Sequence, residues 1–147
     1  MDGKVKAVCI SREKGTKKED IKEAELIENF GIKEDAHAGK WHRQVSLLGI
    51  ESINKMEEMG LDFNLDFGDF AENITTEGIT LYELPIGTIL NIGNEVKLEV
   101  TQIGKECHHG CEILKQVGKC IMPEEGIFTK VIKGGTIKAG DPIKIDK

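Results

Sequence analysis

Three of the four cysteines and two of the four histidines in this chain lie close together, within residues 104–120. The segment follows a strand-like run at residues 96–103 and contains a helix-like run at residues 112–117. A turn after a strand end is a common place for reactive side chains, because loops on a rigid scaffold present them to ligands. We therefore expect residues 104–120 to carry the chemistry and the rest of the chain to position them.

Cys107 is the first candidate for reaction chemistry. A cysteine acts as a nucleophile, a sulfur carrier or a metal ligand only as the thiolate, and an ordinary thiol is ionised to a small extent at neutral pH. Positive charge on Lys105, His108 or His109 would lower the pKa of this thiol, whereas Glu106 would raise it. A turn that exposes Cys107 among these residues predicts a reactive thiol; the alternative is a half-buried cysteine that ends a strand.

Two further interpretations of the cysteine cluster stay open. The cluster supplies enough ligands for a tetrahedral zinc site, formed by Cys107, Cys111, Cys120 and a neighbouring histidine, His109 or His108. Its spacing, however, lacks the Cys-x2-Cys pairs of ordinary zinc fingers and ribbons. In the other interpretation a donor loads Cys107 with sulfur as a persulfide. Cys107 then forms a reversible disulfide with Cys111 or Cys120 as the sulfur is handed on.

Length and charge exclude several classes of protein. The 147 residues are enough for one compact domain with a sizeable core. The formal net charge of -6 argues against nucleic acid or an anionic membrane as the main partner, because both require a basic surface. The chain has no run of about 18 apolar residues, as a membrane-spanning helix needs, and its N-terminus lacks the apolar segment of a signal peptide. We therefore expect a cytoplasmic protein.

Other conspicuous residues are expected to have structural roles. In a cytoplasmic chain, four cysteines are expected to be thiols, metal ligands or buried apolar residues rather than a disulfide framework. Cys9 alternates with its neighbours in a strand pattern and is expected in the core. A basic cluster near the start of the chain is expected to be a solvated loop; it comprises Arg12, Lys14, Lys17 and Lys18.

Short strands separated by glycines dominate the expected secondary structure. Alternating patterns and β-branched residues predict strands at residues 3–10, 44–48, 88–92, 95–103 and 127–133, and a strand followed by a turn at residues 72–79. Two further short strands are expected on either side of Gly140. Together with the 17 glycines, this pattern favours a mainly β fold with a curved or closed, barrel-like sheet and about two short helices.

The remaining segments are helices, loops or ambiguous. Helical spacing of apolar residues predicts a helix over residues 49–59, ended by Gly60, and a second short helix at residues 112–117. Residues 21–30 fit either a helix or a strand. Residues 31–43 are too rich in charge and glycine for a buried element.

Four stretches in a characteristic order resemble a known family. They are residues 31–39, residues 43–48, residues 70–79, and residues 101–107 with the later glycine positions 134–135 and 140–141. On these stretches the chain resembles a stand-alone MOSC domain, the module related to the C-terminal domain of molybdenum cofactor sulfurases. The stretches span nearly the whole chain, which implies a single MOSC domain over residues 1–147. In one departure from the family pattern Gly-Asp-x-His-Ala-Gly, Glu34 replaces the glycine before Asp35.

The resemblance implies both a fold and a ligand. The fold is mainly β and barrel-like, and the ligand is the molybdenum cofactor, a molybdopterin, or a related sulfur or metal species. Cys107, placed by its spacing from Gln102, is implied to be the family cysteine. Pyridoxal phosphate binding is implied at the level of the family only, because the chain is too short to contain the pyridoxal domain of a cysteine desulfurase.

A second group of site residues follows from the same resemblance. Arg43 carries a planar cationic fork that suits the phosphate of a pterin cofactor; the alternative is a surface ion pair. Asp35 and His37 belong to the same group, and His37 either orients a ligand or bonds a loop carbonyl. Asn73 offers an amide donor and acceptor to a polar ligand or to a turn backbone. Glu72 is a candidate acid or base.

Three functions stay open. In the first, the domain binds the molybdenum cofactor and carries sulfur on Cys107 from a donor protein to a metal–sulfur site. In the second, it is a non-catalytic carrier of the cofactor or a metal. In the third, it is a molybdenum-cofactor-dependent reductase of N-hydroxylated compounds. Because the chain lacks the cysteine pattern of an iron–sulfur centre and a Gly-x-Gly-x-x-Gly motif, such a reductase would need an external electron-donor protein.

Overall fold

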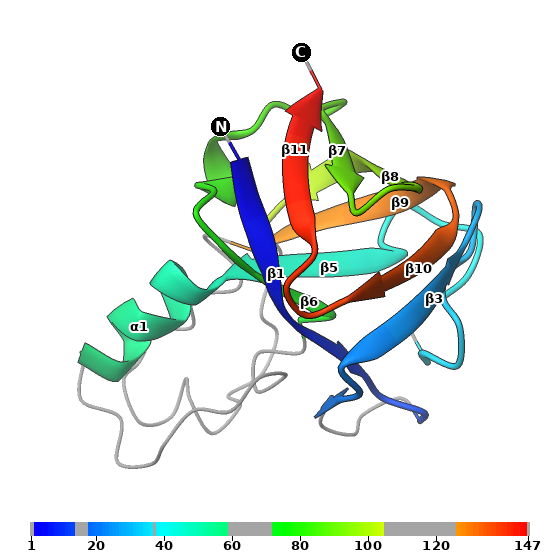
Figure 1. Ribbon diagram of the computed structural model, residues 1–147, viewed down its shortest axis with the longest axis horizontal. Coiled ribbons are helices and arrows are strands. Elements are labelled where there is room, and N and C mark those ends of the chain that lie inside the picture. The colour runs from blue at the N-terminus through cyan, green and yellow to red at the C-terminus, as the bar shows by residue number, and fades with distance from the viewer. Residues whose placement is uncertain (1, 14–17, 37, 59–71, 105–125, 147) are drawn as a thin grey trace.

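A computed structural model describes residues 2–13, 18–36, 38–58, 72–104 and 126–146 (Figure 1). Seven strands close into a barrel, and pairing between β1 and β11 completes the ring. In order around the ring these strands are β11 (Pro142–Asp146), β7 (Ile89–Ile92), β8 (Val96–Ile103), β9 (Ile127–Lys133), β5 (Val45–Gly49), β6 (Ile74–Glu77) and β1 (Asp2–Ile10). The prediction of a mainly β, barrel-like fold is confirmed.

The strand β5 lies between two neighbours that run in opposite directions. It is antiparallel to β9, with Ser46 opposite Phe128, and parallel to β6, with Leu48 opposite Thr75. The other pairings of the ring are antiparallel. A parallel pair requires a crossover connection, and α1 (Ile50–Glu58) begins that connection directly after β5.

The strand β1 is long enough to contact three other strands. Its first residues pair with β11, its middle with β6, and its last two with β2 (Glu19–Asp20). A register shift between Val5 and Ala7 marks a bulge, and a bulge lets a strand bend toward a new partner. Cys9 lies near the end of β1 and is fully buried, as predicted.

A smaller sheet lies beside the barrel and contains β10 (Gly135–Lys138), β3 (Glu23–Ile27) and β4 (Gly31–Ile32) (Figure 1). Of the ambiguous residues 21–30, it makes Glu23–Ile27 a strand, in which Ala24 and Leu26 are buried while alternate residues are exposed. The expectation that residues 31–43 hold no buried element was wrong at β4, where both residues are buried. Glycine permits this close packing: a Cβ at Gly31 would lie 2.8 Å from the carbonyl oxygen of Gln44.

The helix predicted at residues 49–59 is confirmed as α1, with Ile53 buried on its inner face. This helix has nine residues, and within the described ranges no helix is long and apolar enough to cross a membrane. A short 3-10 helix, η1 (Leu81–Glu83), was not predicted, because three residues are too few to show a helical period. The predicted helix at residues 112–117 and the cap at Gly60 lie outside the described residues.

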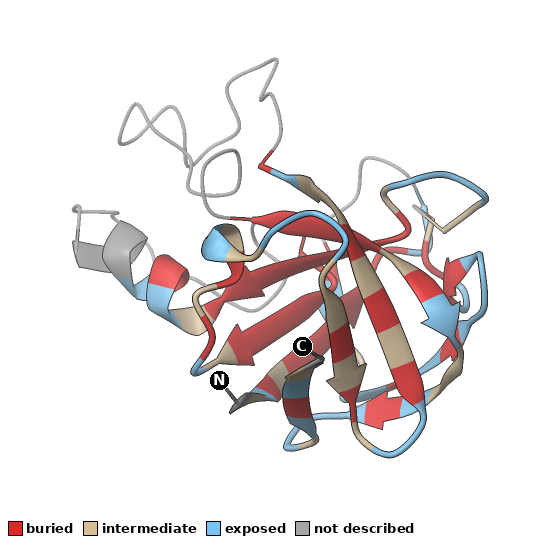
Figure 2. Ribbon diagram, turned by 90° about the horizontal axis from the view of Figure 1, so that it is seen from above, coloured by how far each residue is buried: buried red, intermediate tan, exposed pale blue. Residues whose placement is uncertain are grey.

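Branched aliphatic side chains fill the barrel, and Figure 2 shows the buried positions along its strands. In β8, for example, Val96, Leu98 and Val100 are buried while the residues between them are partly exposed, as the period of a strand requires. A second apolar group is buried outside this main cluster and consists of Ala7, Cys9, Leu48, Ile53 and Phe128. Since alternate strand residues point to opposite faces, its strand members lie on the outer wall of β1, β5 and β9.

Candidate functional site

The structure describes three of the predicted cofactor-binding residues, Asp35, Arg43 and Asn73. His37, Cys107 and the other proposed zinc ligands, His109, Cys111 and Cys120, lie outside the described residues, so their roles stay predictions. Among the residues that are described, no group of three or more histidine, cysteine, aspartate or glutamate side chains is placed to hold a metal ion.

Arg43 and His42 converge on one side-chain amide. Nε of Arg43 donates a hydrogen bond to Oε1 of Gln102 at 3.0 Å. Nε2 of His42 lies 2.9 Å from the same oxygen. Because an amide oxygen only accepts hydrogen bonds, Nε2 of His42 carries the proton in this arrangement. In the sequence analysis Gln102 served only to locate Cys107 by its spacing. Its contacts with residues some sixty positions away produce no local sequence pattern from which they could have been predicted.

The other end of the Gln102 amide is bonded to the start of the cysteine-rich segment. Its Nε2 donates to the carbonyl oxygen of Gly104 at 2.7 Å, and the N–H of Gly104 donates to the carbonyl oxygen of Gly126 at 2.6 Å. Gly104 has a φ of 72°, a left-handed conformation that glycine adopts without strain. Cys107 follows three residues later in the sequence. One amide therefore connects Arg43 to the point from which the predicted thiol segment leaves β8.

The guanidinium of Arg43 is oriented by an aromatic ring as well. Its Cζ lies 5.1 Å from the centroid of the Phe128 ring, an attractive cation–π geometry. Phe128 is 7% exposed, so packing fixes the ring that supports the cation. Within the described part of the chain, the two terminal amino groups of Arg43 have no hydrogen-bond or ion-pair partner. They form a preoriented fork with donors available to an anion.

Asn73 lies directly before β6 and joins the two strands β5 and β1 through its side chain. Its Oδ1 accepts a hydrogen bond from the N–H of Ser46 at 2.9 Å, and its Nδ2 donates to the carbonyl oxygen of Cys9 at 3.0 Å. The hydroxyl of Ser46 adds a contact to Oδ1 at 3.2 Å. Both amide atoms are thus engaged with the backbone of β5 and β1. A ligand role for Asn73 stays a prediction, and its observed contacts are those of a structural amide.

Asp35 lies in a buried ion pair with Lys18. Nζ of Lys18 is 2.8 Å from Oδ1 of Asp35, and the two side chains are 2% and 0% exposed. The N–H of Ser11 donates to the same oxygen at 3.1 Å. The expectation that Lys18 lies in a solvated loop was wrong, because a carboxylate far along the chain compensates for burial of its charge. Oδ2 of Asp35 has no hydrogen-bond partner among the described residues.

Glu34 occupies a backbone conformation that accounts for the family glycine. Its φ is 71°, a left-handed value that costs an L-residue energy but glycine almost none. The carboxylate lies 3.7 Å from a terminal nitrogen of Arg12, and both side chains are 62% exposed. The side chain of Glu34 therefore adds a negative group at the surface, next to the buried Asp35.

Glu72, the candidate acid or base, is completely buried. Thr75 donates a hydrogen bond from Oγ1 to Oε2 of Glu72 at 3.2 Å. Thr75 lies opposite both Leu48 and Ala7 in the sheet, so the carboxylate lies over the outer wall of the barrel. The acid–base role of Glu72 stays a prediction.

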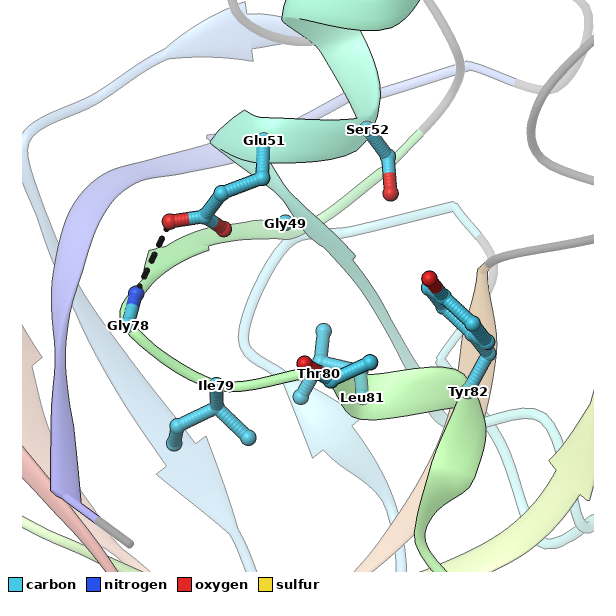
Figure 3. Close-up of a pocket in the computed structure, with 8 residues that line it drawn as sticks. All are labelled: Gly49, Glu51, Ser52, Gly78, Ile79, Thr80, Leu81 and Tyr82. Atoms are coloured by element: carbon cyan, nitrogen blue, oxygen red, sulfur yellow. Dashed lines mark hydrogen bonds between the residues drawn. The ribbon is translucent and has the colours of Figure 1, made fainter.

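A cavity of about 310 Å³ lies at another place, beside the first turn of α1 (Figure 3). None of the predicted site residues lines it. Its walls are formed by β5, α1 and the connection from β6 to η1, through Gly49, Glu51, Ser52, Gly78, Ile79, Thr80, Leu81 and Tyr82. The cavity and the Arg43 fork are thus separate candidate sites.

Comparison with known proteins identifies the family. Residues 34–144 match the family model of the MOSC domain. The chain belongs to the MOSC domain family. MOSC domains are associated with the molybdenum cofactor, so the chain is a molybdenum-cofactor-related domain. Among curated proteins there is no match.

Solved structures share the fold of this MOSC domain. The crystal structure of YuaD from Bacillus subtilis is 19% identical, with a TM-score of 0.82 over 99% of this chain and 96% of that one. YiiM from Geobacillus stearothermophilus is 16% identical, with a TM-score of 0.75 over 99% of this chain and 75% of YiiM. YiiM from Escherichia coli is 19% identical, with a TM-score of 0.67 over 100% and 70% of the two chains. At these identities the likeness shows the fold alone.

The described residues of this MOSC domain fit a molybdopterin-type cofactor in two respects. The terminal amino groups of Arg43, which have no partner among the described residues, suit a phosphate, which carries several acceptor oxygens. Oδ2 of Asp35 is a buried acceptor without a partner among the described residues, and a pterin ring offers N–H donors. An anion fork and an orphaned acceptor are the kinds of group that such a cofactor would use.

Proposed function

We propose that this MOSC domain binds a molybdopterin-type cofactor through Arg43 and carries sulfur on Cys107 for transfer to a metal–sulfur site. The observation that carries the proposal is the double contact of Gln102. Its Oε1 holds Nε of Arg43, and its Nε2 holds the carbonyl oxygen of Gly104. The anion fork and the start of the predicted thiol segment are therefore held by one side chain.

Arg43 supplies charge and direction to this site. With Nε engaged by Gln102, the two terminal amino groups remain for a phosphate and donate in one plane. The ring of Phe128, with its centroid 5.1 Å from Cζ of Arg43, stabilises the cation in this position. A fork that is oriented before binding loses less side-chain entropy when the anion arrives. When bound, the cofactor would supply the metal–sulfur chemistry that the chain itself lacks.

Cys107 supplies the sulfur chemistry of the proposal. Its thiolate attacks the outer sulfur of a persulfide on a donor protein, which releases the donor thiolate and leaves a persulfide on Cys107. The terminal sulfur then passes to the acceptor. If no acceptor is present, the thiolate of Cys111 or Cys120 attacks Sγ of Cys107, expels hydrosulfide and leaves a disulfide, which an external thiol must reduce.

We propose that residues 1–147 form one MOSC domain. The family match covers residues 34–144, and β1 and β11, at the two ends of the chain, pair to close the barrel. Neither end can be removed without opening the ring.

The experiment begins with purification of the protein without oxygen and measurement of its metals by elemental mass spectrometry. The apoprotein is then incubated with molybdopterin released from a donor molybdoenzyme, and the retained pterin is measured by fluorescence. Retention near one pterin per chain, reduced in Arg43→Lys, is the expected result. If the wild-type protein contained about one zinc ion per chain and Cys107→Ser lost it, Cys107 would be a metal ligand rather than a sulfur carrier.

The sulfur step has a separate readout. After incubation with polysulfide, mass spectrometry of the peptide that contains Cys107 should show one added sulfur, which dithiothreitol removes. If the wild-type protein gained sulfur on Cys111 or Cys120 but none on Cys107, Cys107 would not be the sulfur carrier. A carrier of the cofactor alone would retain pterin stoichiometrically without this modification.

A further inference from the structure

The single tryptophan of the chain is exposed and lies close to the Arg43 fork. Trp41 precedes Arg43 by two residues, and two residues of extended chain span about 7 Å at most. Trp41 is 44% exposed. A tryptophan gains much free energy from burial, because its ring system has a large apolar area. Packing does not explain why such a ring stays exposed next to an anion fork.

The ring of Trp41 is oriented by its neighbour His42. The centroids of the two rings are 5.9 Å apart and their planes cross at 69°, an edge-to-face geometry that aromatic pairs favour. The ring of His42 is itself fixed, because its Nε2 donates to Oε1 of Gln102 at 2.9 Å. The exposed Trp41 ring therefore has a preferred direction, which lowers the entropy lost when a ligand covers it.

One amide oxygen positions both the aromatic ring and the cation. Oε1 of Gln102 accepts hydrogen bonds from Nε2 of His42 at 2.9 Å and from Nε of Arg43 at 3.0 Å. From this oxygen, one contact leads through His42 to the Trp41 ring, and the other leads directly to the guanidinium of Arg43. A flat aromatic surface and a phosphate fork are therefore held in a fixed relation to each other.

The backbone around Trp41 is anchored on both sides. The N–H of Trp41 donates to the carbonyl oxygen of Gly39 at 3.0 Å, and the N–H of Gly39 donates to the carbonyl oxygen of Phe30 at 2.7 Å. On the other side, the carbonyl oxygen of His42 accepts a hydrogen bond from Oγ1 of Thr101 in β8. The exposed ring thus projects from a backbone segment that is bonded to two other parts of the fold.

We propose that Trp41 is a stacking platform for the pterin ring of the ligand whose phosphate is bound by Arg43. This inference rests on the proposed cofactor binding and adds the residue that recognises the ring. A pterin is flat and heteroaromatic, and stacking of such a ring on an aromatic side chain raises affinity by roughly fivefold to a hundredfold. The fork alone takes any phosphate, whereas the fork and the platform together select a phosphate that carries an aromatic ring.

Binding to the full chain is measured by calorimetry with neopterin monophosphate, a stable pterin that carries a phosphate. Two matched compounds separate the parts of this probe: neopterin lacks the phosphate, and glycerol phosphate lacks the ring. Neopterin monophosphate should bind at least roughly tenfold more tightly than either compound, because each of them uses only one of the two contacts.

Failure of the platform and failure of the proposed function give different results. If neopterin monophosphate bound no more tightly than glycerol phosphate while Arg43→Lys weakened both, the fork would stand and the platform would be refuted. If neither phosphate compound bound, the fork would be refuted and the platform with it. Adenosine monophosphate joins a purine ring to a phosphate. Tighter binding of adenosine monophosphate than of neopterin monophosphate would assign the platform to a nucleotide and overturn the pterin assignment.

Two variants test the ring of Trp41, and a third serves as the control. Trp41→Ala removes the ring and should weaken binding of neopterin monophosphate by roughly tenfold without an effect on glycerol phosphate. Trp41→Phe keeps an aromatic face and should retain most of the affinity. Tyr82→Ala removes an aromatic ring at the separate cavity and should leave both affinities unchanged. Unchanged affinities in Trp41→Ala, or an equal loss for the two compounds, would overturn the proposal.

An additional readout in the wild-type protein does not depend on the variants. Because the chain has one tryptophan, its indole protons give a single set of NMR resonances. Saturating neopterin monophosphate should produce nuclear Overhauser contacts between the indole protons and the proton on the pterin ring, since stacked rings lie in contact. Glycerol phosphate should leave the indole resonances unchanged. Bound neopterin monophosphate without contacts to the indole would refute the platform.

Discussion

Nε of Arg43 donates its hydrogen bond to Oε1 of Gln102 at 3.0 Å, and this contact fixes which donors Arg43 can offer to a ligand. The engaged Nε leaves the two terminal amino groups, which donate side by side. The same Gln102 holds the carbonyl oxygen of Gly104. A change at either residue of this pair is therefore expected to affect both the anion fork and the start of the cysteine-rich segment.

Replacement of Arg43 by lysine tests the fork directly. Lysine keeps the charge but loses the planar pair of donors and the stack on Phe128, so affinity for molybdopterin should fall by roughly tenfold, as expected for loss of a bidentate phosphate contact. The measurement is pterin fluorescence after equilibrium dialysis. Arg12→Lys is the matched control, because Arg12 is exposed and pairs with Glu34 at the surface. Equal losses in the two variants would show that Arg43 has no special role.

Replacement of Gln102 by leucine removes both of its hydrogen bonds at nearly constant volume. The guanidinium of Arg43 loses its fixed direction, and the carbonyl oxygen of Gly104 loses its donor. We expect weaker molybdopterin binding together with faster hydrogen exchange at the amide of Gly104, measured by NMR. Gln102→Glu keeps an acceptor for Arg43 but cannot donate to Gly104, so it should speed exchange while it retains more of the pterin affinity. Exchange that is as slow in Gln102→Leu as in the wild type would contradict this role.

Asn73 should affect stability more than an ordinary surface asparagine. In Asn73→Ala the buried N–H of Ser46 and the carbonyl oxygen of Cys9 lose their side-chain partner, at about 1–3 kcal/mol for each group left unsatisfied. Asn91→Ala is the control, because Asn91 is only partly buried and accepts one hydrogen bond from Lys97. Urea unfolding measures both. A loss below about 1 kcal/mol in Asn73→Ala would show that its backbone contacts contribute little and would favour a ligand role.

The strands could be predicted because their signal is local. In β8, Val96, Leu98 and Val100 alternate with polar residues, and an alternation of this length is typical of a half-buried strand. The resemblance of the sequence motifs to the MOSC family then predicted a barrel-like fold. Three elements were not predicted. The elements η1 and β2 are too short to show a period, and β4 lies in a polar segment where Gly31, rather than hydrophobicity, permits burial.

The contacts of the candidate site could not be predicted because they cross the fold. The side chain of Gln102 meets Arg43 across 59 residues, and Asn73 meets the carbonyl of Cys9 across 64. No periodic pattern connects such positions. The motifs singled out Arg43 and Asn73 individually, but only the register of β5 with β6 and β9 shows which backbone groups and side chains lie beside them.

The ion pair of Lys18 and Asp35 should be strongly coupled. Lys18→Met leaves the carboxylate of Asp35 buried without its cation, and breaking a buried pair in this way costs about 3–5 kcal/mol. Adding Asp35→Asn should recover a large part of this loss, because the neutral amide still accepts the N–H of Ser11 but no longer buries a charge. Urea unfolding of the two single variants and the double variant gives the coupling. Strictly additive losses would show that the two charges do not depend on each other.

The backbone and the side chain of Glu34 have opposite effects on the free energy of unfolding, and two substitutions separate these effects. With φ at 71°, Glu34→Gly relieves a left-handed L-residue, whereas Glu34→Ala removes the same carboxylate but keeps the strain. We expect Glu34→Gly to be more stable to urea than Glu34→Ala by about 1 kcal/mol. The exposed pair with Arg12 adds little in either case. Equal stability of the two variants would mean that the turn before Asp35 relaxes freely, and backbone conformation would then not be the reason for the family glycine at this position.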